Sequence, residues 1–232
     1  MAFNYSPKTV TDGLVFAVDA ANKKSYPGSG TTWTDLAGSN NGTLTNGPTF
    51  DSGNGGYFDF DGTDDNCVFS GDAIPTNGEI TISFWRSGNA SGQHSDLFAF
   101  TTGTWREVGI HTPWETNIVY WQCGNNGTTG NYNFDEISKT ASSSEYEGWS
   151  NWTFTKNVNT GNMKIYLNGS LWHSGTGKTK NIAACNSMYI GSYGSSYFFS
   201  DKDYACFSIH NKELTPTEVL QNYNALKSRF GL

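Results

Sequence analysis

Residues 152–171 read WTFTKNVNTGNMKIYLNGSL, and this stretch decides the class of fold. Large apolar side chains alternate with polar ones over Trp152–Thr155 and again over Met163–Leu167. A period of two is typical of β-strands that bury one face. The turn-forming segment 157–162 separates the two runs, and Asn168-Gly169 follows them as a dipeptide suited to a tight type I′ turn. The stretch therefore predicts three successive antiparallel strands.

The composition extends this all-β interpretation to the whole chain. Aromatic residues make up 15% of the 232 residues, charged residues make up only 15%, and there are 27 glycines. This balance is typical of many short strands joined by tight turns. No segment rich in proline or serine and no run of charged residues divides the chain. We therefore expect residues 1–232 to form a single domain.

The segment Leu214–Leu232 carries the one strong helix signal. Thr215 can cap a helix whose first residue is Pro216, and Glu218 completes a capping box. Apolar residues then recur at helical spacing until Gly231 ends the pattern, at Val219, Leu220, Tyr223, Leu226 and Phe230. We expect a helix over about 215–230 that docks on the sheets. The alternative is a helical oligomerisation tail.

Further motifs agree with a known family in their order along the chain. They are an opening strand at Gly13–Asp19, Trp33–Gly38 followed by Gly42-Thr43-Leu44, the FDGTDD turn at Phe60–Asp65, and a strand at Ile80–Trp85. With the 152–171 stretch, nearly the whole chain resembles the laminin-G-like, or concanavalin A-like, jelly-roll family. The resemblance implies an all-β sandwich of two antiparallel sheets with one C-terminal helix.

The closing segment LTPTEVLQNYNALKSRFGL is similar to the end of standalone laminin-G-like proteins of tailed bacteriophages, many of them marine. This resemblance implies a non-enzymatic virion protein, either a head decoration or a tail or fibre adhesin. Its implied partners are other virion proteins and a host cell-surface glycan, and it would act as a homo-oligomer or in many copies. One alternative is a glycan-binding lectin domain unconnected with a virion, and the other is a glycoside hydrolase.

Charge and hydropathy exclude other classes of partner. The net charge is −7 and the 14 basic residues are scattered, whereas nucleic-acid binding draws its affinity from clustered lysine and arginine. No apolar run approaches the roughly 18 residues that span a bilayer. The N-terminal residues also lack the pattern of a secretory signal. We therefore expect no nucleic acid, no membrane insertion, and synthesis in the host cytoplasm followed by assembly into the virion.

The carboxylates do not form the pair that glycoside hydrolysis requires. The nearest match to a glucanase motif is Glu136-Ile137-Ser138-Lys139, and Ser138 stands where a second carboxylate is needed. Glu145 and Glu147 are two residues apart but follow a serine-rich segment, which predicts a solvated loop. We therefore expect no catalytic residues.

Cofactor signals are also weak. Asp61, Asp64 and Asp65 are the one candidate calcium site, since hard cations prefer carboxylate oxygens. An Asp-Gly turn between two strands explains the same residues without an ion, and we favour the turn. The four cysteines are widely spaced and are expected to be free, buried thiols rather than disulfides or zinc ligands.

Aromatic residues in loops are the better candidates for binding. Sugars present an apolar C–H face and polar edges, which tryptophan and tyrosine rings with nearby polar groups can recognise. Trp114 lies at the apex of an expected loop, and Tyr193 and Tyr197 flank Gly194-Ser-Ser196 in another. These three are the predicted ligand-binding residues. The alternative is packing, which is expected for the four remaining motif tryptophans, Trp33, Trp85, Trp149 and Trp152.

Overall fold

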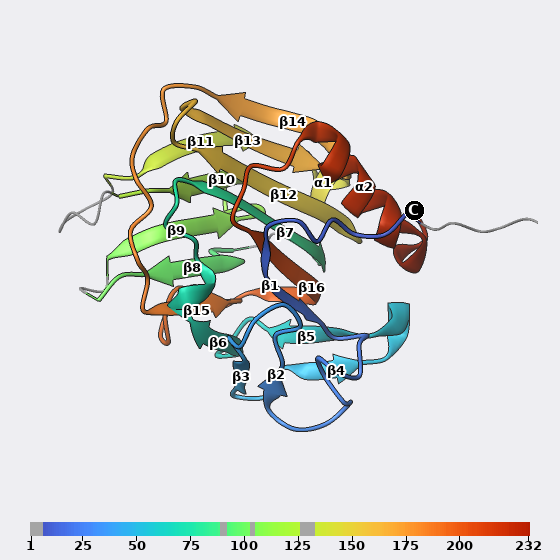
Figure 1. Ribbon diagram of the computed structural model, residues 1–232. Helices are drawn as coiled ribbons and strands as arrows, with labels where there is room; N and C mark the ends of the chain where they lie inside the picture. The colour runs from blue at the N-terminus through green and yellow to red at the C-terminus, as the bar shows by residue number, and fades with distance from the viewer. Residues whose placement is uncertain (1–6, 89–91, 103–104, 126–132) are drawn as a thin grey trace, which may run out of the picture.

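The computed structural model describes residues 7–88, 92–102, 105–125 and 133–232, and in these residues the strands form two sheets stacked face to face (Figure 1). Every pairing between strands is antiparallel. The predicted sandwich of two antiparallel sheets with one C-terminal helix is therefore confirmed.

The first sheet runs in the order β14-β13-β12-β7-β16-β5-β4, and β1 pairs with β16. Its strands are β1 (Leu14–Asp19), β4 (Thr49–Asp51), β5 (Tyr57–Asp61), β7 (Glu79–Ser87), β12 (Ser150–Asn157), β13 (Asn162–Leu167), β14 (Ser170–Gly175) and β16 (Asp201–His210).

The second sheet runs in the order β11-β10-β9-β8-β15-β6-β3-β2. Its strands are β2 (Thr32–Trp33), β3 (Gly42–Thr45), β6 (Asn66–Ser70), β8 (Leu97–Phe100), β9 (Arg106–His111), β10 (Ile118–Cys123), β11 (Asp135–Thr140) and β15 (Ser187–Ile190). The helices are α1 (Ser143–Tyr146) and α2 (Pro216–Leu226), with short 3-10 turns at Gly53–Gly55, Gly71–Ala73 and Lys227–Phe230. None of the helices in the described residues is long and apolar enough to cross a membrane.

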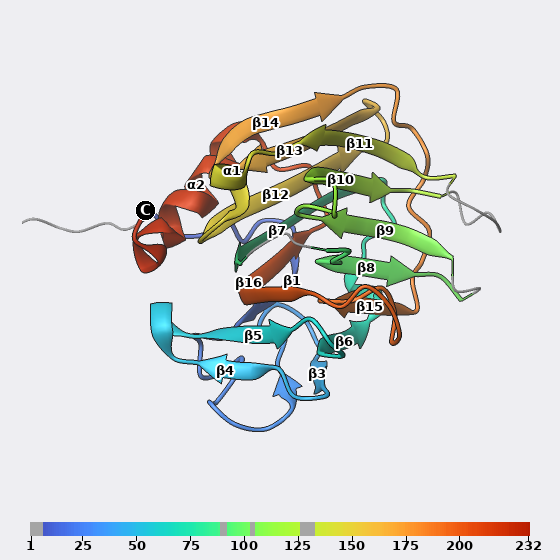
Figure 2. The same ribbon diagram turned by 180° about the vertical axis from the view of Figure 1, so that it is seen from behind.

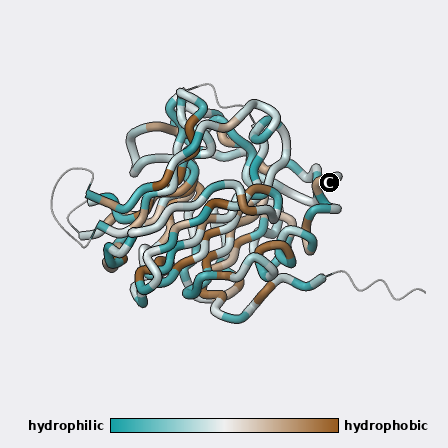
Figure 3. The backbone as a smooth tube through the Cα atoms, turned by 90° about the horizontal axis from the view of Figure 1, so that it is seen from above, coloured by the Kyte–Doolittle hydropathy of each residue, from teal (hydrophilic) through white to brown (hydrophobic). Residues whose placement is uncertain are grey.

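The stretch that opened the sequence analysis forms β12, β13 and the start of β14, as predicted. Asn168 and Gly169 have φ values of 49° and 79°, which a type I′ turn requires. The alternating apolar residues of β12 and β13 point into the space between the sheets, where Trp152, Phe154 and Ile165 are fully buried. Hydrophobic residues concentrate on the strands, and the peripheral loops are mostly hydrophilic (Figure 3).

The core also joins the two sheets by a hydrogen bond. Trp121 of β10 is fully buried, and its Nε1 donates to the carbonyl oxygen of Thr155 on β12 at 3.0 Å. All four cysteines are buried and free, as predicted. Burial raises the pKa of the Cys123 thiol to about 12, which keeps this thiol protonated at neutral pH.

The C-terminal helix docks on the outer face of the first sheet. Thr215 and Glu218 form the predicted capping box. After Leu226 the chain tightens into a 3-10 turn that ends at Gly231, whose φ is 75°. The Phe230 ring stacks on Trp85 with ring centroids 4.2 Å apart.

The prediction for Leu220 was wrong. Leu220 was assigned to the apolar face of the helix, but its side chain is 44% exposed, because Val219 and Tyr223 occupy the positions that face the sheet. Trp85 is buried under the helix and Trp149 packs there partly buried, so both take part in packing as predicted.

A buried ion pair ties the two sheets together. The Lys202 Nζ of β16 lies 2.9 Å from Asp96 Oδ1, next to β8, and both side chains are completely buried. The Tyr204 hydroxyl donates to the same oxygen at 2.8 Å. Burial alone would raise the pKa of Asp96, but the charges of Lys202 and Arg86 outweigh burial and hold that pKa below its ordinary value.

The docked helix predicts a stability effect for Phe230→Ala. Because the ring is buried between Trp85 and Trp149, its loss should destabilise the whole domain by about 3–5 kcal/mol. Leu220→Ala is the matched control and should change stability by only about 0.5 kcal/mol. Urea unfolding followed by tryptophan fluorescence measures both. An unchanged unfolding midpoint for Phe230→Ala, with an altered oligomeric state, would instead support the oligomerisation tail.

The ion pair predicts that Lys202→Met destabilises the domain by about 3–5 kcal/mol, because Asp96 is left as an uncompensated buried charge. The double variant Asp96→Asn/Lys202→Met should recover part of this loss. Chemical denaturation of the two proteins at neutral pH makes the comparison. Equal stability of Lys202→Met and the unmodified chain would show that the pair contributes nothing.

Candidate functional site

The candidate site lies on the outer face of the second sheet, which Figure 2 shows with β8 to β11 toward the viewer. In β10, Val119, Trp121 and Cys123 are fully buried in the core, so the alternate residues Tyr120 and Gln122 face outward. Register places Tyr120 opposite His111 of β9, and Gln122 opposite Gly109. Directly paired residues share a face, so these four positions form one patch.

The hairpin that joins β9 to β10 brings Trp114 to this patch. Trp114 lies in the turn, where its N–H donates to the Ile118 carbonyl at 2.8 Å. The Trp114 and His111 rings meet edge to face with centroids 4.4 Å apart. Asp96 accepts a hydrogen bond from the Thr112 N–H, and Lys202 donates to the Thr112 carbonyl, so the buried ion pair anchors the hairpin at its base.

A second loop, between β15 and β16, covers the other side of the patch. Tyr193 and Tyr197 pair as an isolated β-bridge around the turn at 194–196. The Tyr193 ring lies against Phe98, and Phe198 lies against Trp114, with centroid distances of 5.0 Å and 5.1 Å. Phe198 has a φ of 54°, which is rare for a bulky residue, and such backbone strain tends to occur at functional sites.

Together these elements enclose a cavity of about 370 Å³, hereafter the aromatic cavity. Its volume falls within the range of about 300–1,000 Å³ that is usual for small-molecule sites. The cavity is lined by Arg106, His111, Trp114, Tyr120, Gln122, Tyr193 and Phe198.

Two acceptors lie among the rings of the aromatic cavity. Burial lowers the pKa of His111 to about 3, so the imidazole is neutral at physiological pH. Its Nδ1 lies 2.7 Å from the carbonyl oxygen of His94, which can only accept, so Nδ1 carries the proton and Nε2 is left as an acceptor. The Gln122 Nε2 donates to Glu136, while the buried Gln122 Oε1 has no partner among the described residues. An unpaired buried acceptor is costly, and this one lies against Gly109 at the base of the cavity.

Arg106 and Gly109 complete the floor. The Arg106 guanidinium lies over the Phe134 ring, 4.3 Å from its centroid, and 5.9 Å from the Tyr193 centroid. A side chain at Gly109 would place its Cβ 2.8 Å from Gln122 Oε1 and 2.9 Å from Phe98. Glycine at this position therefore allows the Gln122 and Phe98 side chains to pack directly against the backbone of β9.

The structure brings the three predicted binding residues together. Trp114 and Tyr193 line the aromatic cavity, and Tyr197, which is 63% exposed, lies in a neighbouring hollow that also includes Tyr193. Ligand binding by these residues stays a prediction. Sequence reasoning missed five lining residues, Arg106, His111, Tyr120, Gln122 and Phe198. The outward alternation of Tyr120 and Gln122 against Val119 and Trp121 was the signal that could have found two of them.

The carboxylates of the rejected hydrolase motifs lie apart from one another. Glu136 is opposite Gln122 and Ser138 is opposite Tyr120, so both face outward beside the cavity, but only Glu136 carries a carboxylate. The serine-rich segment before Trp149 was expected to be a solvated loop and is instead the helical turn α1. Both oxygens of Glu145 are engaged there, Oε2 in the capping box and Oε1 by Trp172 Nε1 at 2.6 Å.

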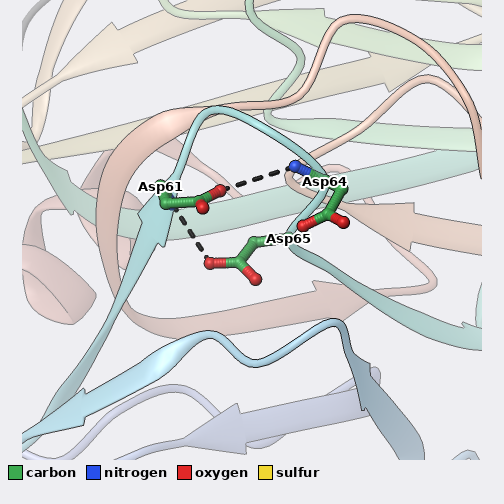
Figure 4. Close-up of side chains that lie close together, drawn as sticks. All are labelled: Asp61, Asp64 and Asp65. Atoms are coloured by element: carbon green, nitrogen blue, oxygen red, sulfur yellow. Dashed lines mark hydrogen bonds between the residues drawn. The ribbon is translucent and has the colours of Figure 1, made fainter.

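The acidic turn between β5 and β6 gathers the carboxylates of Asp61, Asp64 and Asp65 (Figure 4). One oxygen of each lies within 4.8 Å of the others. Asp61 Oδ1 accepts from the Thr63 N–H at 2.8 Å, and Asp65 Oδ2 accepts from the Asp61 N–H at 3.1 Å. Calcium takes about 6–8 oxygen ligands, so these residues would supply only part of its shell. The hydrogen bonds account for the turn, and calcium binding stays a prediction.

Solved structures with the same architecture include receptor-binding domains of botulinum neurotoxins. The type G domain aligns with a TM-score of 0.68 at 17% identity, covering 91% of this chain and 51% of that one. A serotype D domain in complex with N-acetylneuraminic acid aligns with a TM-score of 0.68 at 16% identity, covering 91% and 50%. A serotype DC domain in complex with rat synaptotagmin II aligns with a TM-score of 0.66 at 18% identity, covering 92% and 52%.

These likenesses concern the fold alone, and the chain spans about half the length of each toxin domain. Comparison with curated protein sequences gives no match. A family model described as the concanavalin A-like lectin/glucanases superfamily, laminin G type, matches residues 61–220. Because this match covers more than half of the 232 residues, the chain belongs to the concanavalin A-like lectin/glucanase superfamily.

Proposed function

We propose that this chain is a non-catalytic, glycan-binding domain and that the aromatic cavity is its sugar site. The observation that carries the proposal is a cavity of about 370 Å³ whose walls combine the rings of Trp114 and Tyr193 with the polar side chains of Arg106 and Gln122. Aromatic walls suit the C–H face of a pyranose, and polar side chains suit its hydroxyl groups.

The polar groups of the cavity complement a sugar rather than an ion. The polar side chains of the lining, those of Arg106, His111 and Gln122, are of the kinds that exchange hydrogen bonds with sugar hydroxyls. His111 is neutral and uncharged groups predominate in the lining, so the cavity favours a neutral glycan. Among the described residues that line the cavity, Arg106 is the one formally charged member, and its charge lies over aromatic rings.

The same geometry disfavours hydrolysis. None of the described residues that line the cavity is a carboxylate, and the adjacent Glu136 is held by Gln122. A glycosidase needs two carboxyl groups on either side of the scissile bond. With Ser138 at the second position, the site can hold a sugar but has no acid and base pair to cleave it.

We further propose that the domain acts at the surface of a tailed-phage virion, as a head decoration or a tail or fibre adhesin present in many copies. The support for this setting is the similarity of the closing segment Leu214–Leu232 to phage laminin-G-like proteins. A host cell-surface glycan would then be the ligand. A lectin domain unconnected with a virion remains the alternative, and it uses the same cavity.

The sugar-site proposal predicts that Trp114→Ala and Tyr193→Ala each weaken glycan binding by roughly tenfold or more, which corresponds to about 1.4 kcal/mol. Leu171→Ala removes an exposed apolar side chain on the other sheet and should leave binding unchanged. A glycan array identifies the ligand, and calorimetry with that glycan compares the variants. Binding that survives both aromatic substitutions would place the sugar elsewhere, and release of reducing ends would contradict a non-catalytic role.

The virion proposal predicts that purified particles contain the protein in many copies. Quantitative mass spectrometry of gradient-purified virions, normalised to the major capsid protein, measures that copy number. An unassembled lysate fraction from the same infection is the control. Glycan binding by the isolated domain together with its absence from virions would favour the free lectin domain.

A further inference from the structure

The aromatic cavity has a neighbour on the same face of the sheet. This second hollow, hereafter the outer groove, has a volume of about 520 Å³. Tyr193 lines both, and its ring lies with centroids 5.0 Å from Phe98 and from Phe100, between the two hollows. The two hollows are therefore adjacent and share the Tyr193 side chain as a wall.

The strand register connects the aromatic cavity and the outer groove by one row of paired residues. Gln122 of β10 is opposite Gly109 of β9, Gly109 is opposite Phe98 of β8, and Phe98 is opposite Tyr189 of β15. Paired residues share a face, so this row crosses four strands from the cavity to the groove. Three strand spacings of about 4.8 Å make a path of roughly 14 Å. Such a path is longer than one sugar ring.

The lining of the outer groove matches the chemistry of further sugar rings. It offers the aromatic rings of Phe100, Tyr189 and Tyr197, and Tyr197 is 63% exposed. Its polar groups are hydroxyls and one amide, from Thr101, Thr102, Asn186, Ser187, Ser195 and Ser196. In the described part of the chain the groove has no charged lining residue, which favours a neutral ligand over an acidic one.

We propose that the aromatic cavity and the outer groove form one continuous site for a linear, neutral oligosaccharide of two or more pyranose units, with Tyr193 contacting adjacent rings. The inference rests on the proposed glycan binding at the aromatic cavity. It adds that the ligand is an extended chain crossing β10, β9, β8 and β15, rather than a single terminal sugar.

The test is a length series. Gluco-, manno- and galacto-configured β-linked oligosaccharides of one to six units are titrated into the full chain by calorimetry, with saturation-transfer NMR for weak binders. Affinity in the preferred series should rise by about tenfold or more from one unit to several and then level off. In Tyr197→Ala this gain with length should shrink by about tenfold, whereas in Leu171→Ala it should be retained.

The outcomes separate the two proposals. Equal affinity for the monosaccharide and the hexasaccharide would overturn the extended site and leave glycan binding intact. A gain with length that Tyr197→Ala does not change would also overturn it, because the further rings would then lie outside the outer groove. Selective binding of sialylated or uronate-containing glycans would contradict the neutral ligand. If no glycan bound, the proposed function would fail together with the extended site.

Discussion

The buried carboxylate of Asp96 is the interaction on which the base of the candidate site depends, and it links that base to both sheets. It receives hydrogen bonds from Lys202 and Tyr204 of the first sheet and from the backbone of Thr112 in the second. The Asp96 backbone also pairs with Ile110 and Gly191. A buried charge is tolerated only when its partners are complete. This one residue therefore connects both sheets, the Trp114 hairpin and the loop that begins at Gly191.

The hydrogen bonds of Asp96 hold the base of the candidate site on the outer face of the second sheet. Aromatic side chains from two loops form the rim of that site. The loop at 191–200 is bound at its start by Asp96 and further along by the Ser95 N–H, which donates to the Phe198 carbonyl. Sites on a well-packed scaffold hold their ligand contacts at fixed positions, which lowers the entropy cost of binding. This matters most for Tyr193, because its side chain lines both hollows.

The superfamily to which the chain belongs includes lectins and glucanases, so the scaffold alone does not decide between binding and hydrolysis. The proposed non-catalytic role rests on two outward positions on β11. Glu136 is hydrogen-bonded to Gln122, and Ser138 replaces the carboxylate that a hydrolase would need. The outer face of the first sheet is covered instead by the C-terminal helix, through contacts among Phe230, Trp85 and Trp149.

The sequence by itself determined the two-sheet class, the strands of 152–171 and the capped helix, because alternation, turn dipeptides and capping boxes act between residues close in the chain. It also predicted Trp114, Tyr193 and Tyr197 as binding candidates, since aromatic residues in expected loops stand out locally. Only the tertiary structure decided that these residues meet His111 and Gln122, and that Leu220 faces solvent. Those facts depend on register and on contacts between segments about a hundred residues apart, such as Asp96 with Lys202, which no local pattern records.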